Sequence, residues 1–339
     1  MRCLTLADSL KQNGALIRFV SRDLPNHLRD MLVAKGMELV SLKNTAITSP
    51  IDDLAHSAWL GISQAQDAQD TIQALAEQSW DWLVVDHYAL DARWESAMRD
   101  TAKRIMAIDD LADRQHDCEL LLDQNFYADM QTRYSGKVPA HCQLLLGPQY
   151  ALLREEFRKL REQIKPRTGK VKKLLVFFGG VDADNYTGFA INALADMAIK
   201  EVHVDVVIGA QHPCRAEIET ECATQGFVCH VQTDKMAELM ATADLAIGAG
   251  GSASWERCCF GVPALLLALA ENQIEIAKGL DSIGACIYIG TKDTVNSLTI
   301  QQAVIKLLNT PNKIQLISKE AYSLVDGMGV SRISQTLDY

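Results

Sequence analysis

Short apolar runs alternate with longer periodic stretches along the first half of the 339-residue chain. Leu4, Leu6, Ala7 and Leu10 form an apolar face, so the sequence is predicted to begin in a helix. Further helices are predicted at Pro25–Lys35 and around Asp52–Gln78. The predicted strands are Leu16–Val20, Met37–Ser41, Trp82–Asp86, Arg104–Ile108 and Gln143–Leu146. This alternation is typical of βαβ units and a parallel sheet.

A second series of strands follows the basic stretch Arg161–Lys173, which contains Pro166 and Gly169 and has no apolar period. These strands are predicted at Lys173–Phe178, His203–Ile208, Phe227–His230, Asp244–Ile247, Pro263–Leu267 and Ala285–Ile289. The pattern therefore predicts two Rossmann-like α/β domains with parallel sheets, 1–165 and 171–313, that meet at an interdomain cleft. The tail 314–339, helical over Ile314–Leu337, has no strand left to serve, and we expect it to cross back to the first domain.

Composition excludes several classes of function. Lys and Arg number 33 against 43 Asp and Glu, a net charge of −10, and no basic run appears, so neither nucleic acid nor a membrane is an expected partner. The nine cysteines form no C-x-x-C pair, which indicates reduced thiols and no metal cluster. The start resembles no secretory signal, and the longest apolar stretch, Val262–Ala270, is too short to span a bilayer. We expect a cytoplasmic monomer without a cofactor.

The most informative segment is "ADLAIGAGGSASWERCCFGVPALLLALAENQ", residues 243–273. A strand runs into the small residues 248–251, Ser252 is a suitable N-cap, and a helix is predicted to start near Ala253. Glycines allow a phosphate to approach the backbone, and a helix N-terminus offers unpaired N–H groups. Gly250, Gly251 and Ser252 are therefore predicted to bind a diphosphate.

Two other readings of this segment remain open. The glycines could serve only tight packing of helix against strand. "GAGGSA" also fits G-x-G-x-x-A, and Glu271 follows at the spacing of a dinucleotide site. That fingerprint belongs to the first βαβ unit of a domain, however, whereas this motif follows a late strand.

Three polar residues after the glycines favour a nucleoside diphosphate that carries a sugar. Glu256, one turn into the helix, can accept hydrogen bonds from two ribose hydroxyls. Asn272 and Gln273 begin the next helix at the carboxyl end of the sheet, where open α/β sheets bind ligands. Asn272 could alternatively act only as a helix N-cap.

The C-terminal half resembles the nucleotide-binding half of the glycosyltransferase-B fold. Almost the whole chain resembles one branch of that fold, the UDP-2,4-diacetamido-2,4,6-trideoxy-β-L-altropyranose hydrolases of pseudaminic acid biosynthesis. The segments that carry the resemblance are specific as a set. They are "MRCLTLADSL", "LVVDHYALDARWE", "AIDDLADRQHDCELLLDQN", "LLLGPQYALLREEF", "FFGGVDADN", "ADLAIGAGGSASWERC" and "LAENQ".

The resemblance implies hydrolysis of a UDP-sugar at its anomeric carbon, with inversion, in a pathway that serves flagellin glycosylation. In that family a histidine on a glycine-rich loop, just before the helix that matches "MRCLTLADSL", is taken as the catalytic base. Met1 occupies the position after that loop, so we expect this sequence to bind UDP and to hydrolyse the UDP-sugar slowly or not at all. His87, Asp86 and Asp109 are the fallback candidates for the base.

Other residues are expected to contact substrate. "VVDHY" ends a strand, which is expected to turn Asp86, His87 and Tyr88 into the cleft, and Asp109 and Asp110 end the next strand. By resemblance Arg154 contacts substrate, and its alternative is a surface ion pair. Structural roles are likewise the alternative for His87, as a hydrogen-bonded histidine, and for Asp109, as a capping carboxylate. "FFGGVDADN" is expected to line the cleft floor with the residues Gly179, Gly180 and Asn185.

Two rival functions share the same nucleotide half. One is an inverting UDP-sugar glycosyltransferase, which for a lipid-linked acceptor needs an apolar and basic membrane-facing patch that the first half lacks. The other is a non-catalytic UDP-sugar-binding protein. Release of UDP from the substrate would separate a hydrolase from a binding protein.

Overall fold

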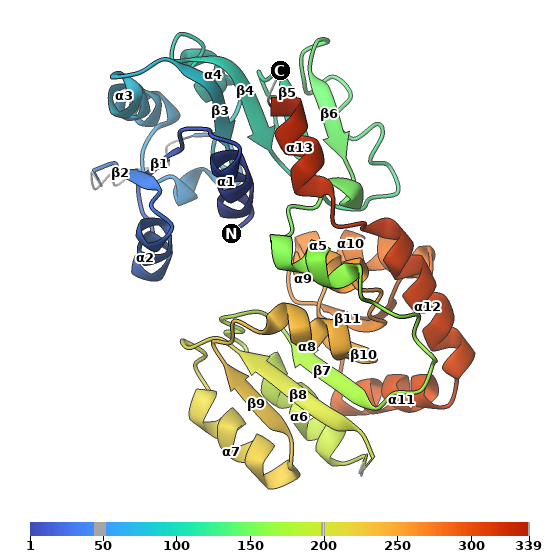
Figure 1. The fold of residues 1–339 in the computed structure, drawn as a ribbon. Coiled ribbons are helices and arrows are strands. Elements are labelled where there is room, and N and C mark those ends of the chain that lie inside the picture. Colours follow the sequence, from blue (N-terminus) through green and yellow to red (C-terminus); the bar gives the residue numbers. More distant parts are fainter. Residues whose placement is uncertain (44–51, 198, 200, 338–339) are drawn as a thin grey trace. The chain divides into compact units, whose positions relative to one another are not determined.

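The computed structural model describes residues 1–43, 52–197, 199 and 201–337. The chain divides into two compact units (Figure 1). Unit 1 comprises Met1–Asn125, Asp129–Leu152 and Gly329–Tyr339, and unit 2 comprises Phe126–Ala128 and Leu153–Met328. Among the described residues, no helix combines the length and apolar character needed to cross a membrane.

Unit 1 contains two parallel sheets. The larger has the order β3-β4-β5-β6, and β1 pairs with β2 in a separate two-stranded sheet. The strands are β1 (Arg18–Ser21), β2 (Glu38–Ser41), β3 (Trp80–Val85), β4 (Ala102–Ile108), β5 (Leu120–Asp123) and β6 (Gln143–Leu146). The helices are α1 (Arg2–Gln12), α2 (Asn26–Ala34), α3 (Gln64–Leu75), α4 (Ala92–Ala97) and α13 (Gly329–Leu337), with short 3-10 turns at Ser57–Trp59 and Pro148–Tyr150.

Helix α1 packs towards both sheets of unit 1. Leu6 belongs to the same buried cluster as Met106 and Ile108 of β4, which also includes residues of α13. Leu4 and Ala7 belong to a second cluster with residues of α2 and of the two-stranded sheet. The first helix therefore links β1–β2 to the four-stranded sheet by side-chain packing, and this packing fixes the position of its first turn.

Unit 2 is built on one six-stranded parallel sheet with the order β12-β11-β10-β7-β8-β9. Its strands are β7 (Lys173–Phe177), β8 (His203–Ile208), β9 (Val228–Val231), β10 (Leu245–Ala249), β11 (Ala264–Ala268) and β12 (Ile287–Thr291). Its helices are α5 (Glu155–Arg161), α6 (Tyr186–Ala195), α7 (Arg215–Gln225), α8 (Met236–Thr242), α9 (Ala253–Cys259), α10 (Glu271–Ser282), α11 (Ser297–Leu308) and α12 (Pro311–Leu324). Because all six strands are parallel, their carboxyl ends share one edge, and the loops there are available for a ligand.

Three sequence-based expectations differ from the structure. The helix expected around Asp52–Gln78 is limited to α3, because Gly61 has a positive φ of 70° and the Ser63 side chain caps a new helix start. The helix expected over Ile314–Leu337 is two helices, because Val325 has extended backbone angles (φ −130°, ψ 108°). Strand β5, four buried residues long, was not predicted.

The division between the units lies at Leu152 and Leu153, ahead of the boundary expected in the basic stretch. Helix α5 therefore groups with unit 2, consistent with the stacking of Phe157 on Phe260 at a centroid distance of 5.2 Å. Within the C-terminal tail, α12 groups with unit 2, and the residues from Gly329 onward group with unit 1. Trp82 of β3 anchors α13 there, since its indole N–H donates to the Leu337 carbonyl at 2.7 Å.

Candidate functional site

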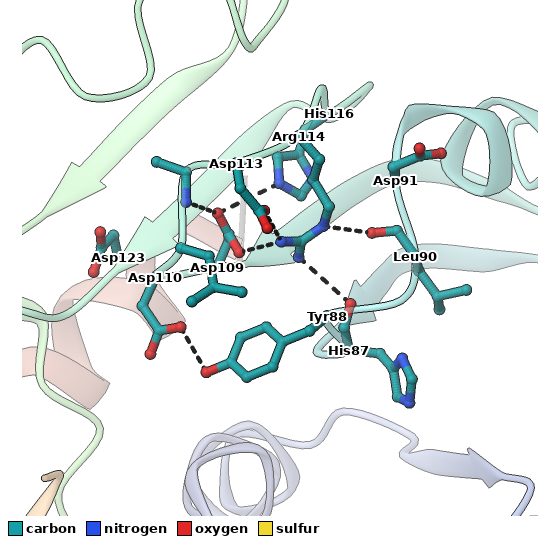
Figure 2. A network of polar contacts seen from close by, with 12 residues as sticks. His87, Tyr88, Leu90, Asp91, Asp109, Asp110, Asp113, Arg114, His116 and Asp123 are labelled. Carbon is teal, nitrogen blue, oxygen red and sulfur yellow. Dashed lines mark hydrogen bonds and ion pairs between the residues drawn. The ribbon is translucent and has the colours of Figure 1, made fainter. Parts of the chain in front are cut away.

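Three neighbouring strands of unit 1 end in aspartates. Asp86 follows β3, Asp109 follows β4, and Asp123 is the last residue of β5. Parallel pairing sets Ile108 beside Leu122, so these ends lie at one edge of the sheet. The result is a concentration of carboxylates, of which Figure 2 shows Asp109, Asp110 and Asp123.

Asp86 is committed to an ion pair with the first turn of α1. The Arg2 guanidinium donates to its two oxygens, from Nε at 2.9 Å and from Nη2 at 2.6 Å, and the Cys3 thiol lies 3.1 Å from Oδ2. Burial alone would raise the pKa of Asp86, but the contacts with Arg2 hold it below its ordinary value. Asp86 is therefore poorly suited to accept a proton, and its assignment as a fallback base is not supported by these contacts.

Asp109 is a structural carboxylate. Its side chain is fully buried, with Oδ1 2.7 Å from Nη1 of Arg114. Its Oδ2 accepts from the N–H of Ala112 at 2.9 Å and lies 3.2 Å from the Tyr134 hydroxyl. These contacts match the capping alternative and leave no oxygen directed to solvent, so Asp109 is not positioned to act on a substrate.

His116 completes the buried charge network beside Asp109 (Figure 2). Its Nδ1 lies 2.8 Å from Glu95 Oε1, and its Nε2 lies 3.7 Å from Asp109 Oδ2. Although burial opposes the charged form, the two carboxylates raise the pKa of His116 to about 9. The imidazolium therefore helps to fix the loop after β4 at neutral pH.

His87 and Tyr88 lie on the loop after β3, and unlike Asp86 they form hydrogen bonds but, in the described part of the chain, no ion pair. The Ala89 N–H donates to His87 Nδ1 at 3.1 Å, which places the proton of the neutral ring on Nε2. Burial lowers the pKa of His87, so the ring is neutral at pH 7. The Tyr88 hydroxyl donates to Asp110 Oδ1 at 2.6 Å. Within the described residues no side chain bonds to His87 Nε2, so of the three fallback bases His87 is the one that no ion pair holds in the charged form.

Asp110, Asn125 and Asp123 extend this cluster. The Asn125 amide donates to Asp110 Oδ2 at 3.1 Å, and its backbone N–H donates to Asp123 Oδ1 at 3.0 Å. Burial raises the pKa of Asp123 to about 7. Sequence reasoning named Asp110 but missed Asp123 and Asn125. The available signal was the run "LLLDQN", which ends a buried strand as "LVVDHY" does.

In unit 2 the glycine-rich loop connects β10 to α9 as predicted, and α9 begins at Ala253. Ser252 holds the N-cap position, but its side chain forms no capping hydrogen bond. The Gly250 N–H donates to the Leu267 carbonyl at 3.0 Å, so this amide is not available to a diphosphate. In the part of the chain that the structure describes, the N–H groups of Gly251 and Ser252 donate to no protein acceptor.

Two of the glycines are required by close packing. A Cβ at Gly248 would lie 2.1 Å from the carbonyl oxygen of Phe177 on β7, which is closer than any side chain tolerates. A Cβ at Gly250 would lie 3.3 Å from Cβ of Ala277 and 3.4 Å from the Gln273 carbonyl oxygen. The packing alternative therefore explains these two glycines, whereas Gly251 has more space.

Gln273 lies beside the glycine loop, and Asn272 is exposed in the first turn of α10. Gln273 Oε1 accepts from the Leu269 N–H at 3.1 Å, and its Nε2 is 3.6 Å from the position of a Cβ at Gly251. Ala270, not Asn272, is the N-cap residue of α10. The structure thus brings Gln273 and the glycine loop together and leaves the Asn272 side chain available.

Glu256 and Arg154 are electrostatic neighbours within unit 2. Burial raises the pKa of Glu256, and Arg154 and Arg257 oppose that shift. Nη1 of Arg154 lies 2.9 Å from Oε1 of Glu156. The ion-pair alternative for Arg154 is therefore present, and its charge also reaches Glu256.

The loop after β7 contains the remaining predicted residues. Asn185 adopts a left-handed conformation (φ 57°) and caps α6, because its Oδ1 accepts from the Gly188 N–H at 3.0 Å. Gly179 has a φ of 116°, and the Gly180 carbonyl oxygen lies 2.0 Å from the position of a Cβ at Gly209. These contacts fix the loop, and the Asn185 amide nitrogen is the part left for a ligand.

Comparison with protein families and curated proteins relates the chain to sugar-nucleotide enzymes. Residues 174–336 match the model of the glycosyltransferase family 28 C-terminal domain. The chain is 30% identical over 215 residues to the spore coat polysaccharide biosynthesis protein SpsG of Bacillus subtilis, over 62% of each protein. It is 30% identical over 159 residues to the UDP-2,4-diacetamido-2,4,6-trideoxy-beta-L-altropyranose hydrolase of Campylobacter jejuni, over 46% of this chain and 56% of that protein. The matches thus span less than two thirds of these relatives.

Solved structures establish the fold. The chain resembles MurG of Acinetobacter baumannii with a TM-score of 0.66 at 14% identity, over 99% of this chain and 95% of that one. It resembles UGT89C1 of Arabidopsis thaliana with a TM-score of 0.66 at 10% identity, over 100% of this chain and 96% of that one. The chain therefore has a glycosyltransferase-B-like fold, and most of its second unit matches the glycosyltransferase family 28 C-terminal domain.

Proposed function

We propose that this protein binds a UDP-sugar through unit 2 and hydrolyses it at the anomeric carbon. The observation that carries the binding step is the pair of N–H groups at Gly251 and Ser252, which have no acceptor among the described residues. Such a pair of backbone donors after a glycine is suited to a phosphate. Glu256 would accept the ribose hydroxyls, and Asn272 and Gln273 would contact the sugar.

The proposed reaction is displacement by water. A base removes a proton from water as its oxygen attacks the anomeric carbon, and the bond from that carbon to the diphosphate oxygen breaks. UDP leaves with the electron pair, and the free sugar forms with inverted configuration. The Gly251 and Ser252 amides would stabilise the charge that develops on the diphosphate.

His87 is the base we assign among the described residues. Its ring is neutral, its Nδ1 accepts from the backbone, and its Nε2 bonds to no described side chain. In this tautomer Nδ1 accepts from the backbone and Nε2 carries the proton. The proton must move to Nδ1, with loss of the contact to the Ala89 N–H, before Nε2 can accept a proton from water. We therefore expect His87 to affect turnover strongly and UDP binding weakly.

The relatives support a UDP-linked 2,4-diacetamido-2,4,6-trideoxy sugar as the substrate, in the biosynthesis of a sugar such as pseudaminic acid. One curated relative is named for hydrolysis of that compound, and another for polysaccharide biosynthesis. A solved relative by fold, UGT89C1, is described in complex with UDP.

A UDP-sugar glycosyltransferase is the second candidate, because the family 28 match and the MurG-like fold apply equally to it. The test is UDP release from UDP-2,4-diacetamido-2,4,6-trideoxy-β-L-altropyranose, with and without candidate acceptors. Hydrolysis predicts UDP release without an acceptor and its loss in His87→Ala, but not in the exposed control His141→Ala. Release that requires an acceptor would favour the transferase, and UDP binding without release would identify a binding protein.

A further inference from the structure

Arg257 lies buried behind the glycine loop of unit 2. It belongs to α9, and only 2% of its surface is exposed. Its Nη2 donates to the Ala249 carbonyl at 2.6 Å and to the Ser254 hydroxyl at 3.1 Å. Its Nη1 is 3.1 Å from the position of a Cβ at Gly248. The guanidinium is thus in contact with the strand end from which the loop continues.

This buried cation has no carboxylate partner. Among the described residues no Asp or Glu oxygen lies within 4.0 Å of its nitrogens, and Nε has no hydrogen-bond partner. Glu256, which precedes Arg257 on the helix, interacts with the guanidinium only electrostatically and without a hydrogen bond. Isolated buried charges are costly to fold, and arginine retains its proton even when buried, so an anion at this place would offset an existing cost.

The bond to Ala249 also orients the loop. It directs the negative end of the Ala249 carbonyl towards the guanidinium, immediately before the residues whose N–H groups are unpaired. With the Gly250 N–H held by Leu267, both ends of the Ala249–Gly250 peptide are fixed. The N–H groups of Gly251 and Ser252 therefore follow a peptide that is fixed at both ends, and the positive charge of Arg257 lies next to that peptide.

We propose that Arg257 is a positioning residue for the diphosphate, which it favours by its charge and by fixing the peptide that precedes the Gly251–Ser252 amides. This inference rests on the proposed function, because the ligand is the UDP moiety. Arg257 would not contact the diphosphate, and its effect would be specific for the negative charge of the ligand.

A purely structural role makes a different prediction. If Arg257 only held the turn, its removal would weaken UDP and uridine binding equally and would lower the melting temperature of the ligand-free protein. A charge effect weakens UDP binding and leaves uridine binding unchanged. The ratio of UDP to uridine affinity therefore separates the two roles, because loss of the bonds to Ala249 and Ser254 lowers the melting temperature in either case.

The experiment uses the full chain with the substitutions Arg257→Met, Arg257→Lys and, as an exposed control, Arg215→Met. UDP affinity is measured by calorimetry and uridine affinity by competition. We expect Arg257→Met to weaken UDP binding by about tenfold, the order expected for two charges roughly 10 Å apart at an effective dielectric constant of about 20, with uridine binding unchanged. Arg257→Lys keeps the charge and should restore part of the difference, and Arg215→Met should behave as wild type.

The outcomes separate this inference from the proposed function. Equal losses for UDP and uridine, or unchanged UDP binding in Arg257→Met, would overturn the inference while wild-type UDP binding still supports the site. If Arg257→Met does not fold, the ratio of UDP to uridine affinity in Arg257→Gln decides, because this variant removes the charge and keeps a side-chain hydrogen-bond donor. An unchanged ratio in Arg257→Gln would assign a structural role and overturn the inference. Failure of the wild-type protein to bind UDP would overturn the proposed function and this inference together.

Discussion

Arg2 and Asp86 form a two-point ion pair that joins the first turn of α1 to the end of β3, with contacts of 2.9 and 2.6 Å. Both side chains are mostly buried, at 20% and 24% exposed. Arg2→Met should lower the free energy of unfolding at pH 7 by about 1.5–3 kcal/mol, because the carboxylate loses a charged hydrogen-bond donor. Urea denaturation of both proteins measures the difference.

The difference in unfolding free energy between wild type and Arg2→Met should depend on pH, because Arg2 lowers the pKa of Asp86. Arg2 holds the pKa of Asp86 below its unfolded value, so the stabilisation is present above about pH 4 and is lost as the pH falls through the folded pKa. The difference in the free energy of unfolding between wild type and Arg2→Met should become smaller at acid pH. Lys103→Met, which removes an exposed pair with Asp81, is the control and should change little at any pH. A gap independent of pH would show that lost packing, not the ion pair, explains the effect.

Protonated His116 stabilises unit 1, and this stabilisation should be lost as the pH rises. Its folded pKa of about 9 lies above the value of about 6.5 for an unperturbed histidine, so its contribution is complete below about pH 6.5 and is lost as the pH rises through about 9. Hydrogen exchange of the β4 amides should report a loss of roughly 2–3 kcal/mol over this interval in wild type. His116→Gln should show a much flatter profile, and the exposed control His141→Gln should follow wild type. The same slope in His116→Gln would exclude His116 as the source.

Glu256 should contribute to UDP binding through the ribose. Glu256→Gln should weaken UDP binding by about 1.5–3 kcal/mol in calorimetry, because hydrogen bonds to a charged acceptor are replaced by weaker ones. Glu271→Gln is the matched control. It also tests the dinucleotide reading, in which Glu271 would accept the ribose hydroxyls. If Glu256→Gln leaves UDP affinity unchanged and Glu271→Gln weakens it, Glu271 and not Glu256 would be the residue that accepts the ribose hydroxyls.

The adjacent glycines of the loop should differ in their tolerance of a methyl group. Gly250→Ala places a Cβ 3.3 Å from Ala277 and 3.4 Å from the Gln273 carbonyl, whereas the nearest atom to a Cβ at Gly251 is 3.6 Å away. Gly250→Ala should therefore lower the free energy of unfolding by about 1–3 kcal/mol through overpacking. Gly251→Ala should have little effect on stability. Thermal denaturation checks the order, and equal effects would contradict the close packing of the loop against α10.

Local patterns in the sequence predicted much of this fold. The runs Gln143–Leu146 and His203–Ile208 are strands at the predicted bounds, because each is a short run rich in Leu, Val or Ile that a glycine follows. The helix start at Ala253 was predicted from the small residues before it. Strand β5 was missed because it follows β4 with no helix between them and so does not fit the alternation of strands and helices. The break at Gly61 was missed because a single glycine within a helical pattern is a weak signal.

The sites were harder to predict because their contacts are distant in sequence. Arg2 and Asp86 are 84 residues apart, and nothing local in either segment indicates that they pair. The Gly250 N–H donates a hydrogen bond to the Leu267 carbonyl, which parallel pairing of β10 and β11 places beside it. Arg257 was one of 33 basic residues, and only its burial distinguishes it.

Proton NMR of the reaction with UDP-2,4-diacetamido-2,4,6-trideoxy-β-L-altropyranose, recorded without any acceptor, tests the central claim most directly. The account predicts that the anomeric signal of the UDP-sugar disappears and that free sugar with the inverted anomeric configuration appears before mutarotation. Signals of UDP should rise at the same rate. A first product with retained configuration, cleavage within the diphosphate to give a sugar phosphate, or no reaction without an acceptor would contradict hydrolysis by direct attack of water.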